Sequence, residues 1–145
     1  MSVSTTPTAG STLLPPLADP SDHEAIRFGE QLLTYRELTG VATYLAGLLE
    51  SKPRVAVWAV SAPETCAAVV GALVAGVPVV PVNPKAGERE LGHIAGDSAP
   101  ELVLAAPGAE LPPALAALRR LDVDARNAGE LCGKLDSLGG QDQRR

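Results

Sequence analysis

The side chains that could do acid–base chemistry are few and lie far apart in the chain. His93 falls in a segment with helical spacing and could act as a general base. No acid or nucleophile stands at a spacing that predicts a catalytic pair with it, so we interpret it as an ordinary, partly exposed histidine. His23 precedes the periodic part of the sequence and is interpreted as structural.

The two cysteines predict neither a redox pair nor a disulfide framework. Cys66 lies in an apolar segment of helical length, where a cysteine is expected to pack as a small hydrophobic residue. Cys132 lies in a polar stretch near the C-terminus and is expected to be an exposed thiol. With only two histidines and no cluster of the two residue types, a zinc site is not predicted.

The acidic residues do not predict a metal site. Glu88 and Glu90 flank Arg89 near a predicted helix start, where negative charge suits the helix dipole. Four aspartates lack the spacing of metal ligands: Asp19, Asp22, Asp122 and Asp124.

Sequence motifs for phosphate binding and for acyl transfer are absent as well. The chain contains no G-x-G-x-x-G after a predicted strand, no G-x-x-x-x-G-K-[ST] and no G-x-S-x-G. We therefore assign no catalytic, cofactor-binding or metal-binding residue, and we interpret Trp58 as a core residue.

The composition predicts one folded domain. The chain has 145 residues, of which 46% are hydrophobic and 20% charged. A net charge of -5 argues against a nucleic-acid partner, since such proteins carry a basic patch.

The first predicted elements are a hairpin and a helix. Residues 25–28 and 31–34 read as short strands, with a glycine-containing turn between them. Thr34 and Glu37 form a capping-box pattern, and apolar residues then recur at helical spacing until about Glu50.

The next two elements are expected to be deeply buried. Residues 55–60 are apolar without alternation, as in a strand covered on both faces. Ser61 and Glu64 form a second capping-box pattern, and the helix predicted over 63–75 is apolar nearly all round. Gly76 is suited to end that helix.

The remaining pattern continues the alternation of strands and helices. The strand predicted over 77–82 contains two prolines and is expected to be irregular or at a sheet edge. A helix over 87–97, a strand over 101–105, a helix over 111–120 and a strand over 121–123 follow. The order predicts an α/β fold in which an N-terminal β-hairpin precedes a mostly parallel sheet with right-handed crossovers.

The two ends of the chain lack this periodicity. We expect a disordered lead over 1–23, a domain over 24–125 and a disordered tail over 126–145. Residues 65–84 carry no charge, but glycine and proline interrupt them, so we expect no membrane span. No targeting segment is recognisable, and a cytoplasmic location is expected.

Several strings resemble the adenylate-forming acyl-CoA synthetase superfamily, the AMP-binding enzymes. They are residues 25–29 followed by Leu33-Thr34-Tyr35-Arg36-Glu37-Leu38, residues 54–57, Pro63-Glu64-Thr65, residues 77–84, and residues 90–94 followed by 97–98 and 101–104. Within the superfamily, residues 55–59, 82–85 and 110–115 most resemble actinobacterial malonyl-CoA synthetases. The resemblance covers about residues 24–126, then stops, and corresponds to the N-terminal portion of such enzymes.

The resemblance implies ligation of a carboxylate such as malonate to CoA with ATP and magnesium. The family's Ser/Thr/Gly-rich loop ending in Pro-Lys-Gly, which holds the ATP phosphates, is absent from these residues. No family catalytic residue falls on a position of this chain, and Asn83 and Lys85 are interpreted as parts of a turn. We therefore expect this chain alone to bind no cofactor and to be inactive.

Three readings remain open. The chain is the product of a truncated or frameshifted synthetase gene, or one chain of a split synthetase whose separate partner supplies the phosphate loop. Alternatively, it is a standalone Rossmann-like binding module, with its site formed by the loop after Val60 and by residues 83–87.

Overall fold

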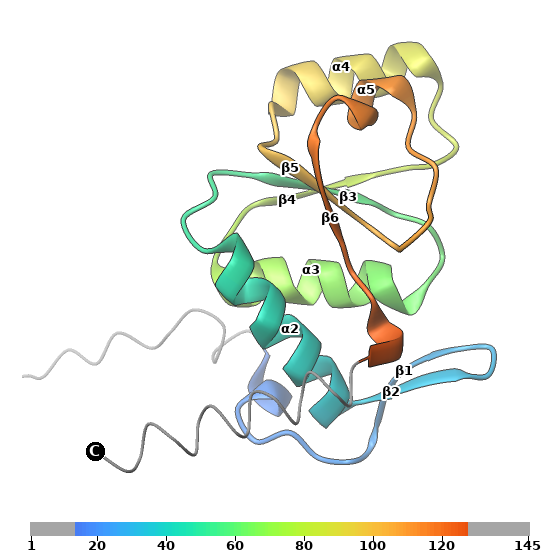
Figure 1. Cartoon of the computed structure of the whole chain (residues 1–145). Helices are drawn as coiled ribbons and strands as arrows, with labels where there is room; N and C mark the ends of the chain where they lie inside the picture. Colours follow the sequence, from blue (N-terminus) through green and yellow to red (C-terminus); the bar gives the residue numbers. More distant parts are fainter. Residues whose placement is uncertain (1–13, 128–145) are drawn as a thin grey trace, which may run out of the picture.

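The structure, a computed structural model, describes residues 14–127. They form a two-stranded antiparallel sheet and a four-stranded parallel sheet (Figure 1), which confirms the predicted fold class. The elements are η1 (Pro15–Leu17), β1 (Glu24–Phe28), β2 (Gln31–Thr34), α2 (Tyr35–Leu49), β3 (Val55–Trp58), α3 (Pro63–Ala75), β4 (Val79–Val82), α4 (Glu88–Ser98), β5 (Leu102–Ala105), α5 (Pro113–Ala116), β6 (Arg119–Asp122) and η2 (Ala125–Asn127).

The parallel sheet has the strand order β4-β3-β5-β6. The chain runs from β3 to β4 on one side and then crosses back to β5 on the other side of β3. The proline-containing strand β4 lies at an edge, as predicted, because Pro81 cannot donate a ladder hydrogen bond.

Helices cover both faces of this sheet. In Figure 1, α2 and α3 lie on one side, and α4 and α5 lie on the other. Alternate residues of β3 point to opposite layers: Val55 and Val57 belong to the apolar cluster with α2 and α3, while Ala56 and Trp58 belong to the cluster with α4. Trp58 is a core residue, as predicted.

The capping box at the start of α2 is confirmed. The Thr34 hydroxyl accepts a hydrogen bond from the Glu37 backbone N–H at 3.1 Å, and the Glu37 carboxylate accepts one from the Thr34 N–H at 2.9 Å. Together these bonds satisfy two backbone donors that the first helical turn leaves unpaired.

The second predicted capping box, between Ser61 and Glu64, was wrong. The N-cap of α3 is Ala62, which makes no side-chain cap bond. Pro63 favours an extended conformation in the residue before it, and Ala62 has φ −155° and ψ 155°. The helix therefore begins one residue later than the Ser61 pattern requires, and β3 ends at Trp58 rather than at residue 60.

The helix α3 is buried on one face only, although we expected it to be deeply buried. Its small residues Ala67, Ala68, Gly71 and Ala72 face the core. Leu73, on the other face, is exposed. The apolar composition of α3 therefore exceeds what the described residues cover. Gly76 ends the helix with φ 70°, as predicted.

The elements near the C-terminus differ from the prediction. The expected helix over 111–120 is reduced to α5, and β6 starts at Arg119 rather than at residue 121. From the sequence, Arg119 and Arg120 were predicted to be the last residues of this helix. In the structure they pair with Leu102 and Val103 of β5. Pairing with a buried strand outweighs the weak local helical preference.

The expected disordered lead over 1–23 was wrong for the residues that the structure describes. Leu17 of η1 packs against the core cluster that contains α2 and α3. The carbonyls of Ser21 and His23 accept hydrogen bonds from the first backbone N–H groups of α2, those of Arg36 and Tyr35.

Residues 1–13 and 128–145 lie outside the described residues, so most of the expected disordered tail does too. Residues 125–127, at its start, form η2. Within the described part of the chain, no helix has the length and apolar character needed to span a membrane.

Candidate functional site

The strand order places a topological switch point between β3 and β5, because the loops that follow these two strands lead in opposite directions. The loop after β3 leads toward β4, whereas the loop after β5 leads toward β6. In open parallel sheets, ligands bind at the carboxyl ends of the strands at such a point. The topology therefore favours the loops at residues 59–62 and 106–112. Residues 83–87, which we had included in a candidate site, follow the edge strand β4.

Each of the two loops is held by a side chain. The Thr65 hydroxyl donates to the Val60 carbonyl at 2.6 Å, across the loop that leads into α3. The Arg120 guanidinium donates to the carbonyls of Ala109 and Ala106 at 2.6 and 2.9 Å. Arg120 also contacts the Asp122 carboxylate at 2.6 Å. These hydrogen bonds fix both loops, and the loop carbonyls of Val60, Ala106 and Ala109 serve as their acceptors.

The loop before α3 does not fit the phosphates of a nucleotide. A phosphate cradle needs free backbone N–H groups at a helix start and glycines that allow close approach. Pro63 has no N–H, the Thr65 N–H donates to the Ala62 carbonyl, and residues 59–62 contain no glycine. The described residues at this point therefore support a scaffold role rather than phosphate binding.

His93 lies on the exposed surface of α4. Its Nε2 is 3.1 Å from an Asp97 carboxylate oxygen, one helical turn away, and both side chains are about three-quarters exposed (75% and 74%). It also lines a wide, open depression of about 680 Å³ with Gly87, Arg89 and Glu90. Among the described residues that line this depression there is no serine, threonine or cysteine, so they provide no nucleophile for His93 to activate.

Cys66 lies on α3 and is partly buried. Burial raises the pKa of its thiol, because desolvation disfavours the thiolate. A thiol of this kind is a poor nucleophile at neutral pH. Cys132 lies outside the described residues.

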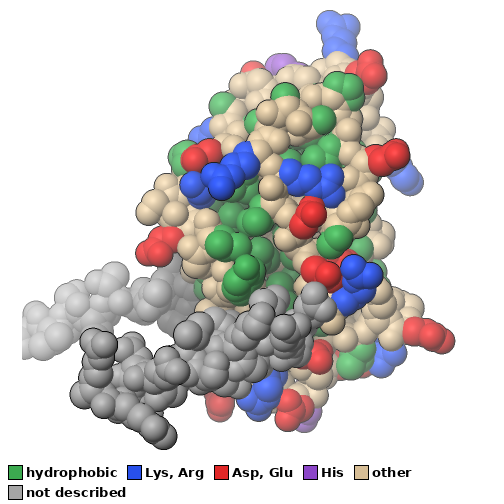
Figure 2. Space-filling model, in the orientation of Figure 1, with side chains coloured by type: hydrophobic (Ala, Val, Ile, Leu, Met, Phe, Trp, Pro, Cys, Tyr) green, Lys and Arg blue, Asp and Glu red, His purple; other side chains and the backbone are tan. Residues whose placement is uncertain are grey.

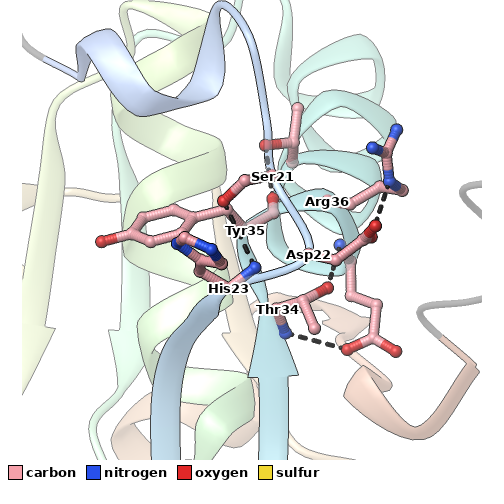
Figure 3. A network of polar contacts seen from close by, with 8 residues as sticks. Ser21, Asp22, His23, Thr34, Tyr35 and Arg36 are labelled. Atoms are coloured by element: carbon pink, nitrogen blue, oxygen red, sulfur yellow. Dashed lines mark hydrogen bonds and ion pairs between the residues drawn. The ribbon is translucent and has the colours of Figure 1, made fainter.

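The residues around His23 form a structural network (Figure 3). The His23 backbone N–H donates to the Ser21 hydroxyl at 3.3 Å, and the Asp22 carboxylate accepts from Arg36 at 2.9 Å. These contacts join the chain before β1 to the start of α2, next to the capping box of Thr34. The arrangement anchors a helix and presents no reacting group.

The predicted turn after β4 is present. The Asn83 side-chain oxygen accepts a hydrogen bond from the Lys85 backbone N–H at 2.9 Å, and the Asn83 carbonyl accepts one from Ala86 at 3.0 Å. Asn83 thus makes the local bonds typical of an Asx turn. Glu88 and Glu90 follow in the first turn of α4, with Arg89 between them.

The described residues contain no group of three or more His, Cys, Asp or Glu side chains that could hold a metal ion. Three of the four aspartates singled out in sequence instead contact arginines. Asp22 contacts Arg36, as described above, and Asp122 contacts Arg120. Asp124 contacts Arg126 at 3.1 Å, and this hydrogen bond lowers the pKa of the Asp124 carboxyl.

The sequence did not predict a pocket of about 180 Å³ that lies between the hairpin and the start of α3. Glu64, with 9% of its surface exposed, lies in its wall and is the buried charged residue of the described part of the chain. Arg126, which also lines the pocket, is attracted electrostatically to Glu64. The pattern around Ser61 had assigned Glu64 to a cap, so its place in a tertiary junction was not expected. The full lining is Gln31, Leu32, Leu33, Glu37, Pro63, Glu64, Ala125 and Arg126.

Comparison with known proteins decides the family. A model of the AMP-binding enzyme family matches residues 17–141. The chain belongs to this family. We had expected the resemblance to stop near Arg126. The match extends to residue 141, so this expectation was wrong. The glycine-rich sequence there contains no motif that stands out by itself, although it lies within the family match.

The curated relatives of this chain include two synthases. Tyrocidine synthase 3 of Brevibacillus parabrevis is 37% identical over 100 residues, which cover 66% of this chain and 2% of that protein. Bacitracin synthase 2 of Bacillus licheniformis is 34% identical over 88 residues, which cover 57% of this chain and 3% of that protein. The chain therefore spans only a small part of either relative.

Solved structures confirm the fold and include a CoA ligase. A malonyl-CoA ligase, solved as a ternary product complex with methylmalonyl-CoA and AMP bound, matches with 60% identity and a TM-score of 0.69. The match covers 74% of this chain and 23% of that chain. The O-succinylbenzoate coenzyme A synthetase of Bacillus subtilis, in complex with AMP, matches with 19% identity and a TM-score of 0.64, and so shows the fold alone. The fold is that of the N-terminal portion of AMP-binding enzymes.

Proposed function

We propose that this chain is the N-terminal portion of a CoA ligase that acts on malonate or methylmalonate. The observation that carries the proposal is the 60% identity to the malonyl-CoA ligase over 74% of this chain. The identities to tyrocidine synthase 3 and bacitracin synthase 2 are lower, at 37% and 34%, and cover less of this chain, at 66% and 57%.

The proposed reaction has two steps. A carboxylate oxygen of the acid attacks the α-phosphorus of ATP, which gives an acyl-adenylate and releases pyrophosphate. The CoA thiol then loses its proton and attacks the acyl carbon, which gives the thioester and releases AMP. Magnesium would neutralise phosphate charge in the first step.

The described residues would serve this reaction as a scaffold. Neither the start of α3 nor the acidic residues of the described part of the chain fit ATP phosphates or magnesium, for the reasons given above. ATP, magnesium and CoA would therefore be held by the rest of such a ligase. As part of this proposal, the 145-residue chain alone is inactive, and its location is cytoplasmic, where ATP and CoA are available.

A joined protein tests the proposal. Residues 1–127 of this chain would replace the corresponding N-terminal segment of the malonyl-CoA ligase. We expect pyrophosphate exchange with ATP that depends on malonate or methylmalonate. Because the remaining ligase supplies the acid site, a soluble, folded joined protein without such exchange would overturn the proposal that this chain is the N-terminal portion of a ligase of this kind.

The matched control replaces the same segment of the ligase with the aligned 100 residues of tyrocidine synthase 3. At 37% identity to this chain, that segment is expected to pack less well against the remaining ligase. Lower exchange in the control would show that the fit, rather than the shared fold alone, restores activity.

The split-synthetase reading uses the same parts as two chains. If a partner chain supplies the rest of the enzyme, mixing the 145-residue chain with the remaining part of the ligase should produce exchange. No exchange from the mixture, together with activity of the joined protein, would exclude assembly from these two chains.

A further inference from the structure

The two edges of the parallel sheet differ in the backbone groups that they expose. Along β4, the carbonyls of Pro78 and Val82 accept hydrogen bonds from β3. Because backbone groups alternate sides along a strand, the backbone of Pro81 faces away from β3. Pro81 has no N–H, so this edge lacks a donor that another strand would need.

The opposite edge keeps its donors. The Val123 N–H donates to the Ala105 carbonyl of β5, so the odd-numbered residues of β6 face β5. By the same alternation, the N–H and C=O groups of Arg120 and Asp122 face outward. No other strand of residues 14–127 pairs with β6, and Arg119, Arg120 and Asp122 are exposed. Among residues 14–127, the β6 edge is therefore left open to a further strand.

The charges of β6 select one antiparallel register with a second copy. A two-fold axis at Leu121 would place Arg120 opposite Asp122 of the other copy, and Asp122 opposite its Arg120. These are the outward-facing residues, so each pair would exchange two backbone hydrogen bonds. Axes at Arg120 or at Asp122 would instead place like charges opposite each other, which destabilises the pairing.

We propose that β6 pairs with β6 of a second copy of this chain, antiparallel and centred on Leu121. The interface is isologous, as in most two-fold dimers, and joins two four-stranded sheets into one. Leu121 packs against the core cluster with α2 and α3, so its backbone position is fixed before association.

The surface beside β6 suits this contact. Figure 2 has the same orientation as Figure 1, in which β6 lies in front of the sheet. Hydrophobic side chains gather there below two groups of basic side chains, with acidic side chains nearby. A second copy would meet both an apolar area and charges of each sign, in addition to the strand edge.

The test compares two substitutions at one position, with the oligomeric state as the readout. Asp122→Ala and Asp122→Pro both remove the carboxylate that contacts Arg120. Only Asp122→Pro also removes the outward N–H, and neither change touches the odd-numbered donors that hold β6 to β5. The difference between the two variants therefore isolates the edge hydrogen bond.

We expect the 145-residue chain to dimerise at about 100 μM in reducing buffer, a concentration that detects weak association. Light scattering after gel filtration should show a weakened dimer for Asp122→Ala and a monomer for Asp122→Pro. Equal thermal unfolding of the two variants would verify that both fold. If Asp122→Pro unfolds, Asp122→Arg replaces it as the variant expected to be monomeric. This substitution places an arginine of one copy opposite Arg120 of the other copy.

Two results would overturn the proposal. One is a monomeric parent chain at that concentration. The other is that folded Asp122→Ala and Asp122→Pro dimerise equally. Where Asp122→Arg replaces the proline variant, the contradicting result is that Asp122→Arg dimerises as strongly as Asp122→Ala. None of these measurements depends on catalysis, so the outcome is independent of the proposed ligase activity.

Discussion

Gly71 lies where α3 packs closely against Leu45 of α2. A Cβ atom built on Gly71 would lie 2.8 Å from the Leu45 Cβ and 3.1 Å from its Cδ1. Since the Leu45 Cβ is fixed to the backbone of α2, the helices would have to separate to accept a side chain. The need for glycine here depends on a tertiary contact, so spacing within α3 did not reveal it.

Gly71→Ala is therefore expected to lower the free energy of unfolding by about 1–3 kcal/mol, the usual cost of overpacking. Gly47→Ala in α2 is the control, because nothing lies within 4 Å of its Cβ position. That change should be neutral or stabilise by up to about 1 kcal/mol through helix propensity. Urea denaturation measures both, and equal effects would contradict the close approach.

Thr34 and Ser61 provide a second comparison of single residues. Thr34→Ala removes the hydroxyl that accepts the Glu37 N–H and should lower the free energy of unfolding by about 1 kcal/mol. Ser61→Ala should change it by less than about 0.5 kcal/mol, because Ser61 does not cap α3. A larger loss from Ser61→Ala in thermal or urea unfolding would restore the second capping box.

The reactivity of Cys66 is a third prediction at this scale. Burial raises the pKa of its thiol, so less thiolate is present at pH 7.5 than in a free cysteine. In a Cys132→Ser background, alkylation by iodoacetamide should be slower than for free cysteine and should recover that rate in 8 M urea (about the concentration that unfolds most domains). Faster alkylation in the folded state would indicate an activated thiol.

At the scale of elements, η1 and the segment after it belong to the folded body. Leu17→Ala should lower the free energy of unfolding by about 1–2 kcal/mol, because the side chain packs against the core cluster but is only partly buried. Leu32→Ala is the control, since the Leu32 side chain is exposed. Equal effects in urea denaturation would mean that the lead contributes no more than a surface residue.

Local patterns predicted the elements wherever one strong signal acted. The capping box and apolar stripe predicted α2, and two prolines predicted that β4 is irregular or at an edge, where the structure places it. Sequence reasoning failed where tertiary pairing decided the outcome. Arg119 and Arg120 have no strand-like pattern of their own and become β6 only because β5 offers a partner.

The candidate site was less predictable than the elements. Glu64 lines a pocket that residues from the hairpin, α3 and η2 build together, and nothing in its own segment indicates those neighbours. The choice between residues 83–87 and residues 106–112 depended on strand order, which alternation of helices and strands leaves open. The family resemblance supplied what local patterns could not, because it identifies the whole arrangement at once.

At the scale of the whole molecule, the described residues form a scaffold with fixed loops and no reacting group among them. Two helical layers enclose a short parallel sheet, one edge of which lacks a donor and the other of which is open. The strongest candidate for chemistry, His93, is exposed and, within the described residues, contacts Asp97. We therefore propose that this portion positions the rest of a ligase and does not itself react.

The most direct test of that claim is His93→Ala in the joined protein described above. We predict that malonate-dependent pyrophosphate exchange stays within about twofold of the unsubstituted joined protein. Removal of a general base costs about 100-fold or more. A loss of that size, with unchanged thermal unfolding, would contradict the scaffold account and place a catalytic residue on α4.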